Sequence, residues 1–167
     1  MHVQKLENEI HDLQQYTRKD NLEIVGIPET KQENLLVVME AVAKSINVDF
    51  KKEDLSIVHR MPTAKGSSSI VAKFSSRSKK IEWIAAARKM KGIKSTDICN
   101  KLPRSDVYVN EHLSPYYKRL LGKAKSLKIN KKLTFVWVRD CKIFVKKSEH
   151  SRTKRIMNEE DLNEYNN

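Results

Sequence analysis

Cysteine is scarce in this sequence, and its scarcity narrows the chemistry. Only Cys99 and Cys141 are present among 167 residues. No C-x-x-C motif occurs, and no His/Cys cluster has the spacing of zinc ligands, so we expect no metal site. Two isolated thiols fit a reducing compartment. We therefore expect an intracellular protein, located in the cytoplasm, the nucleus or both.

Long apolar runs and catalytic motifs are also missing. No run of about eighteen apolar residues and no signal peptide is found, so we expect a soluble chain without a membrane span. The sequence has no G-x-S-x-G, P-loop or H-E-x-x-H motif, and its 5 histidines are scattered. Ser114 near His112 is explained more simply as a helix cap than as a nucleophile. We expect no enzyme and no cofactor.

Positive charge is abundant. Lys and Arg number 33 against 21 Asp and Glu, which gives a net charge of +12. Such an excess favours an anionic partner, nucleic acid first, over a merely solvated surface. Residues 1–50 carry net −4, residues 51–104 net +10 and residues 105–167 net +6. This distribution predicts that the binding surface begins after the first fifty residues.

The first nineteen residues show a heptad pattern. Apolar spacings of 3 and 4 alternate through Val3, Leu6, Ile10 and Leu13. We interpret residues 1–19 as the remnant of a coiled coil that continues upstream. The alternative is an amphipathic helix that lies on its own domain. Because two heptads form a marginal coil, we expect a largely monomeric or weakly associated chain.

Residues 20–112 alternate between strand and helix patterns. Strands are expected at 22–27, 55–60, 69–74 and 107–110, and helices at 33–46 and 78–91. Loops are expected at 65–68 and 92–105. The resulting β-α-β-β-α-β order is the split βαβ of ferredoxin-like folds, which predicts an RRM-like domain.

Residues 113–160 predict a small domain made of a helix and a hairpin. Ser114 as N-cap and Pro115 at the first helical position begin the helix. Strands are expected at 134–138 and 143–146, followed by an acidic turn at 159–165 and a tail at 161–167. The predicted fold class is α+β.

The basic residues predict a surface that follows phosphates. Aromatic residues are few on the expected RRM-like strands, and Phe74 fits a core position as well as a base-stacking one. Charge should therefore dominate binding to single-stranded RNA or DNA, with little sequence preference and strong salt dependence. The candidate nucleic-acid-binding residues are Arg60, Lys73, Arg77, Lys80, Arg88, Lys89, Lys91, Lys94, Arg119 and Lys123.

Several short motifs in order carry a family resemblance. They are residues 18–29 (RKDNLEIVGIPE), His59-Arg60, residues 70–74 (IVAKF), residues 86–89 (AARK), residues 109–113 (VNEHL) and residues 137–143 (WVRDCKI). Over residues 5–155 the chain resembles first-open-reading-frame proteins of LINE-type retrotransposons. It is also similar to arthropod relatives of the baculovirus few-polyhedra protein.

The resemblance implies a trimeric coiled coil, an RRM-like domain and a C-terminal domain that together act as a nucleic-acid chaperone in a ribonucleoprotein. It places Arg60, Arg88 and Arg119 where that family has RNA-contacting arginines. Cys141 departs from the family's hairpin, which has Gly after Asp, and must adopt positive φ or another turn. The rival interpretation is a viral-type or host interaction protein whose basic surface binds acidic proteins or membranes.

Overall fold

The chain forms two compact units, which we describe from a computed structural model covering residues 2–62 and 68–167. One unit comprises residues 20–112, and the other joins residues 1–19 to residues 113–167. Helices and antiparallel strands occur in both units, so the expected α+β class is confirmed. Of the loop expected at 65–68, residues 65–67 lie outside the described residues.

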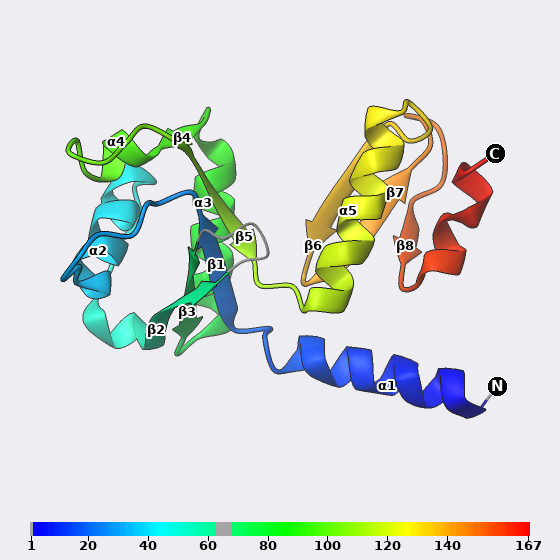
Figure 1. The fold of residues 1–167 in the computed structure, drawn as a ribbon, viewed down its shortest axis with the longest axis horizontal. Helices are drawn as coiled ribbons and strands as arrows, with labels where there is room; N and C mark the ends of the chain where they lie inside the picture. The colour runs from blue at the N-terminus through cyan, green and yellow to red at the C-terminus, as the bar shows by residue number, and fades with distance from the viewer. Residues whose placement is uncertain (1, 63–67) are drawn as a thin grey trace. The chain divides into compact units, whose positions relative to one another are not determined.

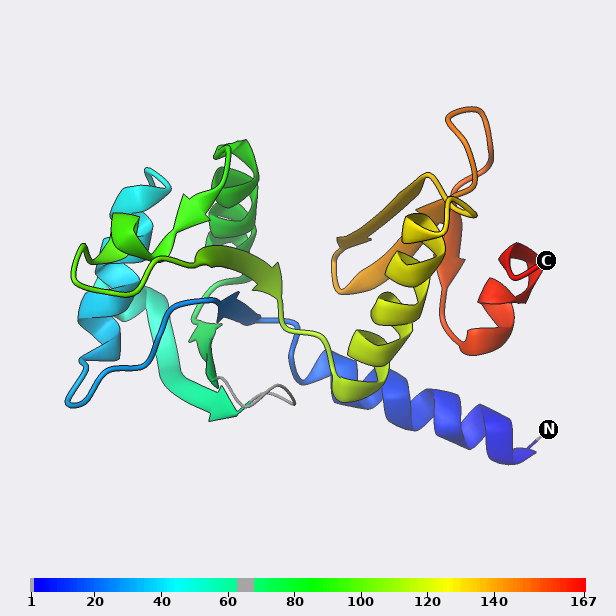
Figure 2. The ribbon, with the colours of Figure 1, turned by 45° about the horizontal axis from the view of Figure 1, so that its top comes forward.

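Residues 20–112 form one antiparallel sheet, with strands in the order β2-β3-β1-β5-β4 (Figures 1 and 2). The expected β-α-β-β-α-β order is present, while kinship to the RRM stays a prediction. The elements are β1 (Asn21–Val25), α2 (Leu35–Ser45), η1 (Lys52–Asp54), β2 (Leu55–Pro62), β3 (Ser68–Phe74), α3 (Arg77–Lys89), β4 (Ile93–Lys94), α4 (Ser95–Ile98) and β5 (Asp106–Glu111).

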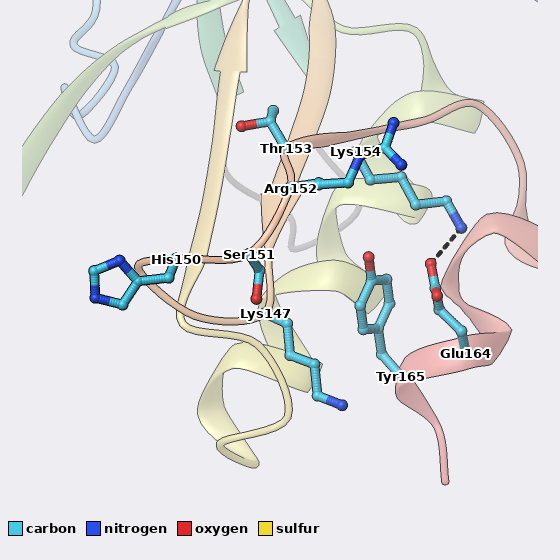
Figure 3. Close-up of a pocket in the computed structure, with 8 residues that line it drawn as sticks. All are labelled: Lys147, His150, Ser151, Arg152, Thr153, Lys154, Glu164 and Tyr165. Atoms are coloured by element: carbon cyan, nitrogen blue, oxygen red, sulfur yellow. Dashed lines mark hydrogen bonds and ion pairs between the residues drawn. The ribbon is translucent and has the colours of Figure 1, made fainter.

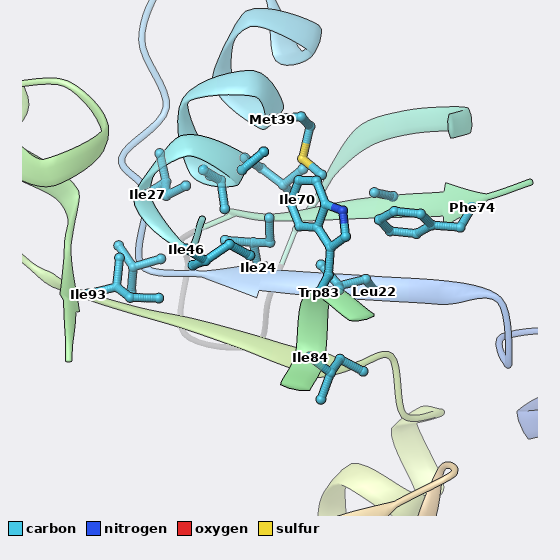
Figure 4. Close-up of a cluster of buried hydrophobic side chains, with 14 residues drawn as sticks. Leu22, Ile24, Ile27, Met39, Ile46, Ile70, Phe74, Trp83, Ile84 and Ile93 are labelled. Carbon is cyan, nitrogen blue, oxygen red and sulfur yellow. The ribbon is translucent and has the colours of Figure 1, made fainter. Parts of the chain in front are cut away.

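The core of this unit lies between the sheet and helices α2 and α3 (Figure 4). Alternate residues of a strand face the same side, so Leu22 and Ile24 of β1 and Ile70 of β3 all face the helices and are fully buried. Trp83 of α3 meets Phe74 edge-on, with ring centroids 5.4 Å apart. Phe74 is thus a core residue, and its use in base stacking is excluded by its 2% exposure.

The stretch 92–105, expected to be a loop, contains β4 and α4. A two-residue strand and a single helical turn are too short to leave a hydrophobic period in the sequence. Gly26 supports this corner of the unit, because its φ is +101° and a Cβ there would collide with the Asp106 carbonyl. Ser105 also donates a hydrogen bond to the Gly26 carbonyl oxygen at 2.5 Å.

The other unit is built on a three-stranded antiparallel sheet, in the order β6-β7-β8, that packs against α5 (Figure 1). As predicted, the Ser114 hydroxyl caps α5 by accepting from the Tyr117 amide, and Pro115 follows. Strand β8 was not predicted. The elements are α1 (His2–Tyr16), α5 (Pro115–Ile129), β6 (Phe135–Arg139), β7 (Lys142–Lys146), β8 (Lys154–Ile156) and η2 (Glu159–Tyr165).

Two details of this unit bear on the sequence predictions. The turn between β6 and β7 has positive φ at both central residues, 52° at Asp140 and 60° at Cys141, so Cys141 does adopt the left-handed conformation in place of glycine. The segment 161–167, expected to be a tail, contributes Leu162 and Tyr165 to the buried core.

Helix α1 lies on its own unit through its polar face. The Gln15 side chain accepts from the Ser114 amide at 2.8 Å, the Tyr117 hydroxyl donates to Asp12 at 3.1 Å, and His11 stacks on Tyr116. The heptad residues face away from these contacts, with exposures of 68% at Val3, 49% at Leu6, 52% at Ile10 and 65% at Leu13. Folding of the unit therefore leaves the apolar seam of α1 unused.

Candidate nucleic-acid interface

Positive charge is distributed unevenly between the two units. The unit of residues 1–19 and 113–167 carries 17 basic and 9 acidic side chains, a net charge of +8. Residues 20–112 carry 16 basic and 12 acidic side chains, a net charge of +4. The stretch 51–104, which is the most basic part of the linear sequence, folds together with the acidic stretch 20–50. Most of the positive excess therefore belongs to the other unit.

Arg60 is held inside its own unit. Its Nε and Nη2 donate to the two carboxylate oxygens of Glu33, both at 2.8 Å, and the two side chains are only 11% and 12% exposed. Nη1 donates to the carbonyls of Ile27 and Ser68, and Nη2 also donates to that of Pro28. These contacts occupy all five N–H donors of a guanidinium. Arg60 thus fastens the loop before α2, and we leave it out of the candidate interface.

The Arg60 contact also sets the charge of its partner. The hydrogen bond from the guanidinium lowers the pKa of the Glu33 carboxyl, with the backbone amide of Thr30 adding to the effect against the cost of burial. Glu33 is therefore ionised at neutral pH, and the pair is a charge-assisted, bidentate one.

Four more of the predicted residues have carboxylate partners. Lys80 is 2% exposed and lies 2.8 Å from Glu111, on the helix-covered side of the sheet, so its charge does not reach the surface. The other three pairs are exposed or partly exposed: Arg77 with Asp20, Lys94 with Asp106, and Lys123 with Glu159. Exposed pairs hold weakly and exchange readily with a stronger anion. Lys80 is removed from the candidate interface, and these three stay at its margin.

The remaining predicted residues have exposed side chains. Arg88 and Lys89 end α3 and Lys91 follows directly, so these three share one end of that helix. Lys73 lies on β3, opposite Asn21 and Ile57, on the sheet face away from the helices. Arg119 lies on the exposed side of α5 and belongs to the other unit.

A basic pocket in the C-terminal unit escaped sequence reasoning (Figure 3). The segment between β7 and β8 faces η2 across an open cavity of about 550 Å³. Its lining combines cationic and hydroxyl groups, the set that binds phosphate oxygens. The lining residues are Lys147, His150, Ser151, Arg152, Thr153, Lys154, Glu164 and Tyr165. Residues 146–155 are rich in basic and hydroxyl side chains, and this composition was the available sequence signal for the pocket. The run matches no known motif, so it did not stand out.

The Glu164 carboxylate reduces the positive charge of this pocket. Lys154 donates to Glu164 at 2.6 Å, which raises the pKa of Lys154 and lowers that of Glu164, so both stay charged. Burial raises the pKa of Tyr165, which keeps its hydroxyl a hydrogen-bond donor at neutral pH. No salt bridge is described for the pocket cations Lys147 and Arg152, although the charge of Lys147 also acts on Glu164, and we take these two as the candidate phosphate ligands.

The outer face of the β6-β7-β8 sheet also escaped sequence reasoning. Strand pairing sets Trp137 opposite Phe144 and Arg139 opposite Lys142 on the face turned away from α5. Phe135 and Arg155 lie on the same face. The period-two alternation at 135–139 and 142–146 was the available signal, but it reveals which side is buried only once α5 is placed.

Neither a metal-ligand cluster nor a membrane-spanning helix is found in the described part of the chain. Residues 2–62 and 68–167 hold no group of three His, Cys, Asp or Glu side chains placed to share a metal ion. None of the helices described is both long and apolar enough to cross a bilayer. Cys141 is buried and Cys99 is exposed, and both are free thiols.

Comparison with known families assigns almost the whole chain. Residues 19–110 match the family model described as Baculovirus FP protein domain 1. Residues 114–166 match the model described as Baculovirus FP protein domain 2. No curated protein matches the chain.

Proposed function

This chain belongs to the baculovirus FP protein family, and from that premise and its charge distribution we propose that it is a non-enzymatic protein that binds single-stranded nucleic acid through phosphates. The observation that carries the proposal is the net +8 of residues 1–19 and 113–167. A charge of this size on a small unit attracts polyanions over several ångströms and raises association rates.

The proposed contacts come from both units, considered separately. In the C-terminal unit they are Arg119 and the pocket cations Lys147 and Arg152. In the unit of residues 20–112 they are Lys73 and the group Arg88, Lys89 and Lys91. Phosphate contacts of this kind position a strand without reading its bases, so we expect weak sequence preference.

The finer part of the proposal follows the resemblance to LINE-type first-open-reading-frame proteins. A protein that binds single strands better than duplexes lowers the free energy of melted strands and so speeds strand exchange. We propose that the chain works in this way as an intracellular nucleic-acid chaperone within a ribonucleoprotein, in the cytoplasm or nucleus. Annealing and strand-exchange assays with labelled oligonucleotides test this part independently of binding.

Salt dependence of binding tests the central proposal. Fluorescence anisotropy of a labelled single-stranded oligonucleotide should give a log K that falls with log salt by about 0.7 for each phosphate contact. The double variant Lys147→Ala, Arg152→Ala should weaken binding. It should also make the slope shallower by the contribution of roughly one to two phosphate contacts. Lys44→Ala, which removes an exposed charge from α2, is the matched control and should change neither. A salt-independent affinity contradicts the proposal.

The family match favours one rival, a viral-type interaction protein whose basic surface meets acidic proteins or membranes. The same anisotropy experiment, with anionic lipid vesicles or an acidic peptide as competitor, separates the two functions. Under our proposal the oligonucleotide is displaced only by another nucleic acid at moderate salt. Displacement by vesicles or peptide at equal charge concentration favours the rival.

Self-association through α1 is a further part of the proposal. The exposed seam of Val3, Leu6, Ile10 and Leu13 is the surface that a coiled coil would bury. Because two heptads stabilise a coil only marginally, we expect a monomer or weak association at micromolar concentration. Light scattering measures this, and a stable trimer would show that surfaces outside α1 hold the chains together.

A further inference from the structure

The outer face of the β6-β7-β8 sheet carries aromatic rings between cations. Strand alternation sends Val136, Val138, Ile143, Val145 and Ile156 toward α5, where Ile143, Val145 and Ile156 are at most 1% exposed. The residues between them face outward. They are Phe135, Trp137 and Arg139 on β6, Lys142, Phe144 and Lys146 on β7, and Arg155 on β8.

The aromatic rings on this face are arranged as a partly exposed platform. Trp137 and Phe144 are stacked across the two strands, with centroids 5.7 Å apart and planes 24° apart. Phe135 is 41% exposed, and the Lys146 ammonium lies 5.9 Å from its ring centroid. At the β6 edge of this face, Phe135 and Trp137 line a shallow hollow of about 490 Å³ together with Val136, Lys146, Glu149 and Lys128 of α5. Rings at this exposure are available to a planar ligand.

Stabilisation of the hairpin explains only part of this arrangement. A cross-strand aromatic pair such as Trp137–Phe144 strengthens a hairpin by itself. It does not explain the exposed Phe135, nor the cations Arg139, Lys142 and Arg155 around the rings. Among the described residues no carboxylate lies within ion-pair distance of these three cations. An anionic ligand with flat apolar groups satisfies both features.

We propose that this face is a base-stacking site for single-stranded nucleic acid, a proposal that rests on the function proposed above and adds a second mode of contact. Phe135 and Trp137 each take the face of one base, while Arg139, Lys142 and Arg155 hold the phosphates alongside. Residues two apart on a strand are separated by about 7 Å. That is about twice the 3.4 Å rise per base along one strand, so the two rings meet different bases.

Stacking on this face selects single strands over duplexes. Base faces are exposed in a single strand and hidden in a duplex, whereas phosphates are exposed in both. The site therefore supplies the strand preference that a phosphate-binding surface alone lacks. Stacking is also tolerant of sequence, because every base has a planar face.

The two tryptophans allow a direct test in the full chain. Trp83 is 0% exposed in the core of the other unit, so only Trp137 can stack on a base. Addition of a single-stranded oligothymidylate of about 12 nucleotides should quench part of the tryptophan emission, and a duplex of equal length should quench little. The variant Trp137→Phe should keep near-normal affinity, because it keeps a ring, but lose the quenching.

Leucine substitutions measure the contribution of the rings. Phe135→Leu with Trp137→Leu should weaken single-strand binding about tenfold or more for each ring, leave duplex binding unchanged and leave the salt slope unchanged. Tyr16→Leu is the matched control, since Tyr16 is an aromatic residue 61% exposed on α1, outside the β6-β7-β8 sheet, and it should have no effect. Arg139→Gln with Lys142→Gln should instead flatten the salt slope.

The outcomes separate the two proposals. Salt-dependent binding with unquenched Trp137 emission and a normal Phe135→Leu, Trp137→Leu variant overturns the stacking site and leaves the proposed function standing. An absence of oligonucleotide binding overturns both. If the leucine variant fails to fold, the quenching in the unmodified chain decides, because it requires no substitution.

Discussion

Replacement of Arg60 by alanine should destabilise the unit of residues 20–112 without removing nucleic-acid binding by the folded chain. The guanidinium donates two hydrogen bonds of 2.8 Å to Glu33 and three more to backbone carbonyl oxygens. Both charged side chains are nearly buried. Loss of one partner of a buried ion pair costs about 3–5 kcal/mol. Because a little solvent reaches the pair, we expect the lower end, about 3 kcal/mol.

The expected change is measurable by thermal unfolding. For a domain of this size each kcal/mol lowers the melting temperature by about 4–8 °C, so Arg60→Ala should lower it by about 12–24 °C. Arg77→Ala is the matched control, because Arg77 pairs with Asp20 in the same unit but is 53% exposed. It should cost less than about 1 kcal/mol. Equal melting temperatures for the two variants would refute the stabilising role assigned to Arg60.

The same pair predicts a pH dependence. The folded-state pKa of Glu33 lies below its ordinary value of 4.5, so its contribution to stability is complete above pH 4.5 and is lost as the pH falls below it. Glu33→Gln should remove that part of the acid dependence and lower stability at pH 7. Oligonucleotide affinity, measured below the melting transition, should stay normal in Arg60→Ala. A folded variant with lost affinity would return Arg60 to the interface.

Three further predictions concern stability. Lys80→Met should cost about 3–5 kcal/mol in chemical denaturation by leaving Glu111 buried without its cation, and the double variant with Glu111→Leu should recover most of that loss. Gly26→Ala should destabilise by more than about 1 kcal/mol, because of its φ of +101° and the collision of a Cβ with the Asp106 carbonyl, and wild-type stability would refute this. Burial, with the hydrogen bond to Asp12, raises the pKa of Tyr117 to about 12, so the unit should lose stability between about pH 10 and pH 12. Asp12→Asn should lower that pKa toward 10 in an ultraviolet titration, and an unchanged titration would exclude the contact.

Local sequence patterns determined much of the fold. The alternating strands around Ile24 and Ile70, the helical period of α2 and the Ser114-Pro115 start of α5 appear where the sequence predicts them, since each depends on residues within one turn or strand. For Cys141 the sequence left two alternatives, positive φ or another turn, and the structure shows positive φ at both Asp140 and Cys141. Elements shorter than one period, such as β4, α4 and β8, left no such trace.

The candidate site depended on contacts that no linear pattern contains. In the sequence Arg60 and Lys80 are two cations in a basic stretch, and only folding brings Glu33 and Glu111 beside them and removes their charges from the surface. Likewise, Trp137 and Phe144 alternate with apolar residues on both sides, and the position of α5 decides which set becomes core and which becomes platform. Charge sums and periodicities are local properties of the sequence. The pairing of charges and the exposure of rings are tertiary, because they depend on residues that meet only when distant segments pack together.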